Sequence, residues 1–133
     1  MKPGNRILVA LLIAYCLASL VHFVHNAEFL RDYPRMPDAL SRGDVYVAWL
    51  AMTVIGLAGW LLVKRGYPIV GFVALIAYAV LGLDSLGHYV VAPMAAHTLA
   101  MNATILLEVT CAALVLIEVI RQLALHLKGY VRA

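Results

Sequence analysis

The sequence predicts an all-α fold, an integral membrane four-helix bundle with both termini cytoplasmic. Of its 133 residues, 65% are hydrophobic and 13% are charged, whereas soluble domains have about 45–50% apolar and about 25% charged residues. A soluble chain of this length has too much surface for its volume to hide so many apolar side chains. The apolar residues also gather into four runs, each near the ~20 residues needed to cross a ~30 Å hydrocarbon core. Lipid therefore surrounds most of the chain.

The four runs are the expected helices, and together they make one transmembrane domain over residues 1–133. They cover residues 7–25, 45–63, 67–86 and 94–120. We expect helices because a helix satisfies its backbone hydrogen bonds within one segment, and because the alternating polarity of barrel strands is absent. Pro34 and Pro37 disfavour helix in the first connection, residues 27–44. A tight turn at 64–66 and a short link over 87–93 complete the chain.

The cations predict the orientation of the helices. Seven of them fall on one side of the expected bundle: Lys2, Arg6, Lys64, Arg65, Arg121, Lys128 and Arg132. Three fall on the other, Arg31, Arg35 and Arg42. Because short cytoplasmic loops carry the excess of Lys and Arg, both termini are expected in the cytoplasm, with the chain in the plasma membrane (the inner membrane of a bacterium). The cations form no basic face with interleaved aromatic residues, so nucleic acid is not an expected partner.

Polar and ionisable side chains gather in the non-cytoplasmic half of three helices. Such groups are costly in lipid and usually mark a site or an internal pair. They lie at the end of the first helix, the end of the third and the start of the fourth: His22, His25, Asn26, Glu28, Asp84, Ser85, His88, His97, Met101, Asn102, Thr104 and Glu108. At ~1.5 Å per residue, the four histidines and Asp84 lie roughly 22–35 Å from the cytoplasmic ends of their helices, and Glu108 about 18 Å. These side chains are therefore expected at similar depths.

Helical spacing also places several of these side chains on common faces. His22 and His25 can converge on the first helix, and Asp84 and His88 form an i, i+4 pair on the third. On the fourth helix one polar stripe, expected to face the interior, consists of His97, Met101, Thr104, Glu108 and Cys111. Near the cytoplasmic boundary, Glu118 and Arg121 are spaced to form an ion pair.

Imidazoles and carboxylates at one level favour a divalent metal site for zinc, iron or copper. The preferred ligands are His22, His25, Asp84 and His88. His97, Glu28 and Glu108 are further ligands or groups that orient the ligands. If the site is catalytic, Glu28 or Glu108 is the candidate base for a metal-bound water. The sequence leaves open whether the protein is an enzyme.

The segment His25-Asn26-Ala27-Glu28-Phe29 resembles the H-x-x-E-E signature of the HXXEE-domain membrane proteins. Those are small bacterial multi-helix proteins with no established activity to transfer. The resemblance covers this one segment, and Phe29 stands where the second glutamate is expected. It implies a polar site at the exit of the first helix and names no substrate.

Other functions remain open. Haem held between two histidines, His22 or His25 against His88 or His97, ranks below a metal ion because the chain has no haem-attachment motif. A dimeric proton-coupled transporter would use Glu108. Its size is that of the small multidrug exporters, whose essential acid resembles Glu108 in burial but lies on the first helix.

The remaining alternative is an accessory subunit of a larger membrane complex. It would pack against its partner, or against a second copy in a homo-oligomer, through close-approach glycines such as Gly56, Gly59 and Gly71.

Overall fold

The computed structural model describes residues 3–131 of the chain, with side chains from 6 to 129. Within that range it contains four long helices: α1 (Pro3–Glu28), α2 (Arg42–Lys64), α3 (Pro68–Leu83) and α5 (Leu99–Val131). Three short elements, η1 (Asp84–Leu86), α4 (Gly87–Val91) and η2 (Met94–Ala96), connect α3 to α5. Four segments are long and apolar enough to cross a membrane: Arg6–Glu28, Arg42–Lys64, Pro68–Val91 and Leu99–Gly129. The predicted fold class, a helical membrane bundle, is confirmed.

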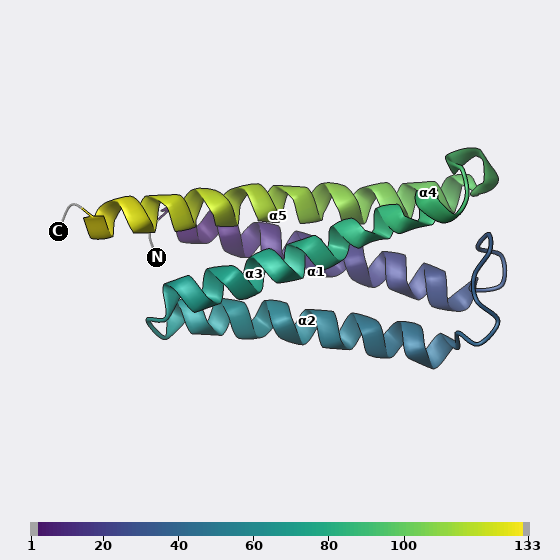
Figure 1. The fold of residues 1–133 in the computed structure, drawn as a ribbon, viewed down its shortest axis with the longest axis horizontal. Helices are drawn as coiled ribbons and strands as arrows, with labels where there is room; N and C mark the ends of the chain where they lie inside the picture. Colours follow the sequence, from purple (N-terminus) through teal and green to yellow (C-terminus); the bar gives the residue numbers. More distant parts are fainter. Residues whose placement is uncertain (1–2, 132–133) are drawn as a thin grey trace.

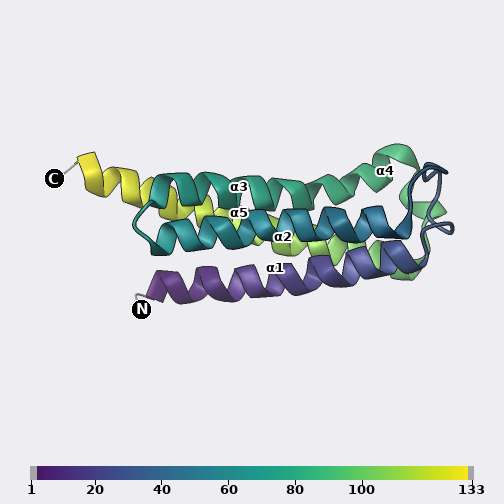
Figure 2. The same cartoon turned by 90° about the horizontal axis from the view of Figure 1, so that it is seen from below.

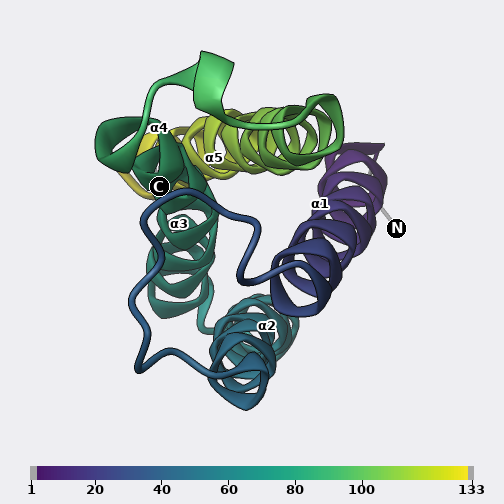
Figure 3. The ribbon, with the colours of Figure 1, turned by 90° about the vertical axis from the view of Figure 1, so that its right-hand side faces the viewer.

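The two ends of the bundle differ in character. α1 begins and α5 ends at the same end as the turn between α2 and α3, which we call the terminal end (Figure 1). The connection over residues 29–41, α4 and η2 form the opposite end, the loop end (Figure 2). Viewed along the bundle, α5 lies between α1 and α3, with α2 across from it (Figure 3). The assignment of the terminal end to the cytoplasm stays a prediction, and two of its cations, Lys2 and Arg132, lie outside the described residues.

Local chemistry sets where the helices begin and end. Ser41 caps α2 in a reciprocal box, because its hydroxyl accepts from the Asp44 amide while the Asp44 carboxylate accepts from the Ser41 amide. Thr98 caps α5 in a related way by accepting from the Met101 amide at 3.2 Å. The fourth helix therefore begins at Leu99, whereas the hydropathy had placed its start at residue 94.

The same helix also continues past residue 120 to Val131. The predicted pair of Glu118 and Arg121 is confirmed there, with two charge-assisted hydrogen bonds of 2.7 and 2.8 Å. The Gln122 amide donates to the same carboxylate at 2.8 Å. These contacts lie one turn apart along the helix and support its extension beyond the apolar run.

Glycines bring α2 and α3 into close contact inside the bundle. A Cβ added at Gly56 would lie 2.7–2.9 Å from the Tyr78 ring, and one added at Gly71 would lie 2.7 Å from the Gly59 carbonyl oxygen. The small-residue face therefore packs internally, as membrane helices do at close crossings. It is not the free surface for a partner that the accessory-subunit hypothesis assumed.

The apolar core fills the half of the bundle nearer the terminal end. Its most completely buried members come from three helices: Tyr15, Leu75, Ala79, Ala112, Val115 and Val119. Of these six side chains only Tyr15 has a polar group, and its hydroxyl donates a hydrogen bond to the Tyr78 carbonyl at 3.0 Å. In this half of the bundle the interior between α1, α3 and α5 is therefore dry and densely packed.

The α2–α3 contact makes a stability prediction. Gly71→Ala places a methyl group against the Gly59 carbonyl and the Val63 backbone nitrogen, each 2.7 Å from the added carbon, so backbone must shift. We expect a loss of about 1–3 kcal/mol in the free energy of unfolding, measured by circular dichroism in a denaturing-detergent titration. Gly87→Ala is the control, because nothing lies within 4 Å of its added carbon. Equal stability of the two variants would contradict the close crossing.

Candidate functional site

Polar side chains from α1, from the loop after it and from the chain between η1 and the first turns of α5 meet inside the bundle. We call this group the polar cluster, and its members are His22 and Asn26 of α1, Tyr33 of the loop, Ser85 of η1, His88 of α4, His97 before α5, and Thr104 and Glu108 of α5. His22 and Asn26 are four residues apart on α1, and Thr104 and Glu108 are four residues apart on α5, so both members of each pair lie on one helix face. The packing of α1 against α5 brings those two faces together.

Glu108 is the deepest member of the polar cluster. Its side chain is completely buried, at 0% exposure. One carboxyl oxygen, Oε2, accepts a 2.6 Å hydrogen bond from the Ser85 hydroxyl and lies 3.7 Å from Nε2 of His22. The other oxygen, Oε1, has no hydrogen-bond partner within the described part of the chain. A carboxyl group in this position is costly to ionise unless a positive charge accompanies it.

The hydrogen bonds of Thr104 fix the tautomer of His22. The Thr104 hydroxyl donates to the Met101 carbonyl at 3.0 Å, which leaves its oxygen as the acceptor for Nδ1 of His22 at 3.3 Å. The His22 proton therefore resides on Nδ1, and the basic Nε2 faces Glu108. Because His22 is only 2% exposed, water does not compete strongly for this nitrogen.

Tyr33 covers the polar cluster on the loop side. Its ring centroid lies 5.0 Å from that of His88 and 6.4 Å from that of His22, and its hydroxyl is 2.9 Å from Nδ1 of His25. Burial raises the pKa of the Tyr33 hydroxyl to about 12, so this group is a neutral hydrogen-bonding hydroxyl at physiological pH. His25 is half-buried and connects Tyr33 with the surface of the loop end.

His88 and His97 complete the polar cluster, with ring centroids 6.1 Å apart. Nδ1 of His97 donates to the Pro93 carbonyl at 3.1 Å, so Nε2 bears the lone pair. This Nε2 is buried and has no hydrogen-bond partner among residues 6–129. Nε2 of His88 accepts from the Asn26 amide at 3.4 Å. One imidazole thus points an unused acceptor into the bundle.

The structure brings together some of the predicted site residues and separates others. His22, His88, His97 and Glu108 belong to the polar cluster, and His25 lies beside it. No group of three or more His, Cys, Asp or Glu side chains in the described range could hold a metal ion. The predicted seven-residue set of metal ligands therefore does not converge.

Glu28 and Asp84 are the acids that lie elsewhere. Glu28 accepts from the Tyr46 hydroxyl at 2.9 Å and pairs with Arg42 at 3.2 Å, because six residues after His22 it has turned toward α2. Asp84 is exposed at the start of η1. The expected i, i+4 pairing of Asp84 with His88 assumed a continuous α-helix, whereas a 3₁₀ turn lies between them; the Asp84 carboxylate still interacts electrostatically with the His88 ring.

Two tyrosines were missed by the sequence analysis, Tyr33 and Tyr89. Tyr89 donates to the Asn102 side-chain oxygen at 2.9 Å, and its ring lies 5.4 Å from that of His97. The sequence offers little indication that Tyr33 belongs to the site, because it is a single tyrosine before a proline in a charged loop. Hydropathy gives no reason to fold such a loop back over the bundle.

The surroundings of the polar cluster differ between its two sides within the described residues. On the terminal side of Glu108 three apolar α5 side chains are completely buried, Ala112, Val115 and Val119, and the next buried polar one is Glu118, ten residues away. On the other side the half-buried His25 and His88 lead to the surface. Half-buried polar side chains thus lie between the polar cluster and the loop end, whereas fully buried apolar side chains lie between it and the terminal end.

Comparisons with protein families, with curated proteins and with solved structures find no match to this chain. The resemblance of the segment from His25 to Phe29 to the HXXEE-domain proteins therefore stays a prediction. The site has to be interpreted from its own geometry.

The contact between Ser85 and Glu108 makes a prediction for a double-mutant cycle. Ser85→Ala removes the 2.6 Å hydrogen bond and should destabilise the protein by about 1–3 kcal/mol in the wild-type background. In the Glu108→Leu background the loss should be smaller, giving a coupling of about 0.5–3 kcal/mol. Asp84→Ala is the control, since the exposed Asp84 should show no coupling to Glu108. A cycle in which Asp84 couples as strongly as Ser85 would contradict the arrangement.

Proposed function

We propose that this chain is a proton-coupled membrane protein in which Glu108 and His22 together bind one proton. The observation on which the proposal rests is the position of the basic Nε2 of His22, 3.7 Å from Oε2 of a completely buried carboxyl group. The 3.7 Å separation is longer than a hydrogen bond, so the two groups share a proton when the side chains approach by less than about 1 Å or when one water bridges them. The burial of both keeps that proton apart from bulk water.

Charge balance explains why such a pair would couple a proton to another species. With one proton between them, Glu108 and His22 are neutral overall, either as carboxylic acid and imidazole or as carboxylate and imidazolium. When the proton leaves, one negative charge stays in the bundle, which is costly at this depth. A cation or a cationic group of a substrate that takes the proton's place removes this cost. Exchange of a proton for a cationic substrate follows from the same electrostatics.

Access to the pair is also consistent with coupled exchange. Thr104 holds the His22 ring, and Tyr33, His25 and His88 line the way to the loop end. The dry core blocks the way to the terminal end. A site open to one side of the membrane at a time is what alternating access requires.

Glu108→Gln provides the test, with proteoliposomes in which the loop end faces outward. Acidifying the outer solution should protonate the exposed acids of the loop end in both proteins, and the wild type should show one further infrared carbonyl-stretch band, from the buried carboxyl group, which Glu108→Gln should remove. Glu118→Gln is the control on the same helix, because Glu118 is paired with Arg121 at the other end. The proposal fails if the band survives in Glu108→Gln, or if it follows the pH of the inner solution alone.

A second candidate function, binding of a divalent metal ion, rests on His97. Its Nε2 is buried and unpartnered among the described residues while its Nδ1 is held by a backbone carbonyl, the arrangement typical of metal-ligating histidines. His88, with its ring centroid 6.1 Å away, and the unpartnered Oε1 of Glu108 are further donors. Zinc, iron or copper suits such a donor set. Because no three ligands converge among the residues that the structure describes, a metal ion would require these side chains to turn toward one another.

Elemental analysis of the purified protein distinguishes the two candidates. If a metal ion is bound, the wild type should contain about one equivalent, which His22→Ala, His88→Ala and His97→Ala should each lower. His126→Ala should leave the content unchanged, because His126 lies near the terminal end of α5. Equal content in all five proteins excludes the metal role and leaves the proton proposal standing. An absorbance spectrum of the same samples tests for haem.

A further inference from the structure

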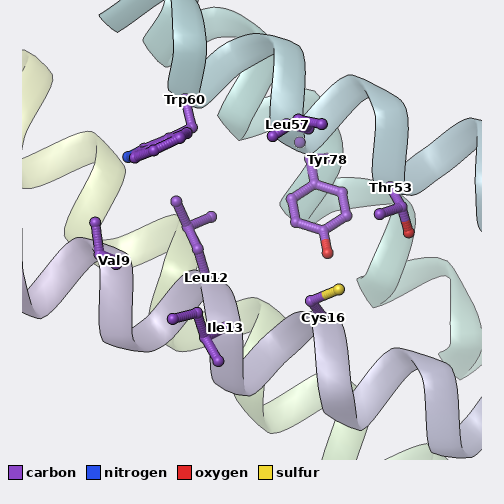
Figure 4. A pocket seen from close by; sticks show the side chains of 9 residues that line it. Val9, Leu12, Ile13, Cys16, Thr53, Leu57, Trp60 and Tyr78 are labelled. Carbon is purple, nitrogen blue, oxygen red and sulfur yellow. The ribbon is translucent and has the colours of Figure 1, made fainter. Parts of the chain in front are cut away.

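A cavity of about 300 Å³ lies between α1 and α2, away from the polar cluster. Its walls are Val9, Leu12, Ile13 and Cys16 of α1, Thr53, Gly56, Leu57 and Trp60 of α2, and Tyr78 of α3 (Figure 4). Its volume is at the lower end of the range for ligand pockets, about 300–1,000 Å³. The cavity is separate from the proton-binding pair, and its occupant is independent of that proposal.

The cavity exists because two helices diverge. α1 and α2 separate toward the terminal end, and both side views show the divergence (Figures 1 and 2). Between Thr53 and Trp60 the cavity runs about 10 Å along α2. Gly56 lies in the middle of this stretch, where the Tyr78 ring covers the backbone. The cavity is thus an elongated apolar slot, and it lies in the half of the membrane's hydrocarbon core nearer the terminal end.

The polar atoms of the slot require no polar ligand. The Thr53 hydroxyl has no partner within the described residues, but a helical threonine can turn its hydroxyl to the carbonyl one turn earlier. Cys16 is a free thiol and behaves as a small apolar group in such surroundings. The slot is therefore chemically suited to a hydrocarbon chain.

Basic side chains lie beside the end of the slot that is nearer the terminal end of the bundle. The Lys64 ammonium nitrogen lies 5.8 Å from the Trp60 ring centroid, so it stands directly beside the wall of the slot. Arg6 is exposed and precedes the lining residue Val9 by three positions, which places both on the same side of α1. Arg65, also exposed, follows Lys64 in the turn. Basic side chains at a membrane surface attract anionic headgroups.

We infer that the slot between α1 and α2 binds an anionic phospholipid. One acyl chain lies along Leu12, Ile13 and Leu57, and the headgroup phosphate lies between Arg6 and Lys64. The apolar walls account for the chain, and the two cations account for the choice of headgroup. Because the slot is open to the bilayer between α1 and α2, the lipid can enter it from the side.

Fluorescence quenching of Trp60 tests this inference. The chain has two tryptophans, so Trp49→Phe leaves Trp60 as the sole reporter. The protein is placed in phosphatidylcholine bilayers that contain a small fraction of brominated phosphatidylglycerol or, separately, brominated phosphatidylcholine with the same chains. Phosphatidylglycerol should quench Trp60 more strongly. Its preference should fall about fivefold for each cation removed in Arg6→Gln and Lys64→Gln.

Two further variants test occupation of the slot itself. Ile13→Phe adds volume at its rim, where Ile13 is 57% exposed, and should reduce quenching by phosphatidylglycerol. Leu17→Phe is the matched control, because Leu17 is equally exposed, at 58%, one turn further along α1 and outside the slot. Equal quenching by both headgroups, or equal effects of the two phenylalanines, overturns the inference.

A second copy of the chain is the competing occupant. In a Cys111→Ser background it would give disulfide cross-linking through Cys16 together with protection of Trp60 from both brominated lipids. That result would also overturn the inference.

Discussion

The structure depends on the cost of placing a polar group in hydrocarbon. A backbone amide, hydroxyl, imidazole or carboxyl group in lipid has no water to bind, so it must find a partner within the chain. The helices meet this requirement for the backbone. For the side chains, the bundle meets it by turning the polar faces of α1 and α5 toward each other and by folding Tyr33 over them. The position of the polar cluster is therefore a consequence of the membrane, and its chemistry is a consequence of which groups were left to pair.

The membrane fold was predictable because composition and segment length decide it. Four apolar runs of sufficient length in so short a chain leave no other fold class, and the four spans are present. The ends of the helices were less predictable, because they depend on single residues. Thr98 starts α5 by accepting one backbone hydrogen bond, and the Glu118–Arg121 pair helps it to continue. Hydropathy averages over many residues and does not detect such local contacts.

The candidate site was predictable in its α-helical part and less so elsewhere. His22 and Glu108 lie on regular helices, so their depth and face follow from residue spacing, and the two meet in the bundle. Asp84 and Glu28 were assigned to the site on the same reasoning. The 3₁₀ turn after Leu83 and the rotation of α1 past His25 place them outside it. Tyr33 could not be placed at all, because a loop with two prolines has no fixed periodicity from which to infer where a side chain points.

The polar cluster and the slot show opposite solutions to incomplete packing. At the loop end the space between helices is closed by the chain itself, and polar atoms fill it. Within the described part of the chain three buried polar atoms remain without partners there, on Asn26, His97 and Glu108, and one, the Thr53 hydroxyl, lies at the slot. At the terminal end the helices part instead, and the walls of the gap are apolar, so the bilayer can fill it without loss. Unpaired polar atoms in a closed space favour binding of a proton or an ion, which must enter from the solvent. The open apolar slot instead favours binding of a lipid, which the surrounding bilayer already supplies. The two ends of the bundle are therefore expected to exchange with different phases, the loop end with water and the terminal end with the bilayer.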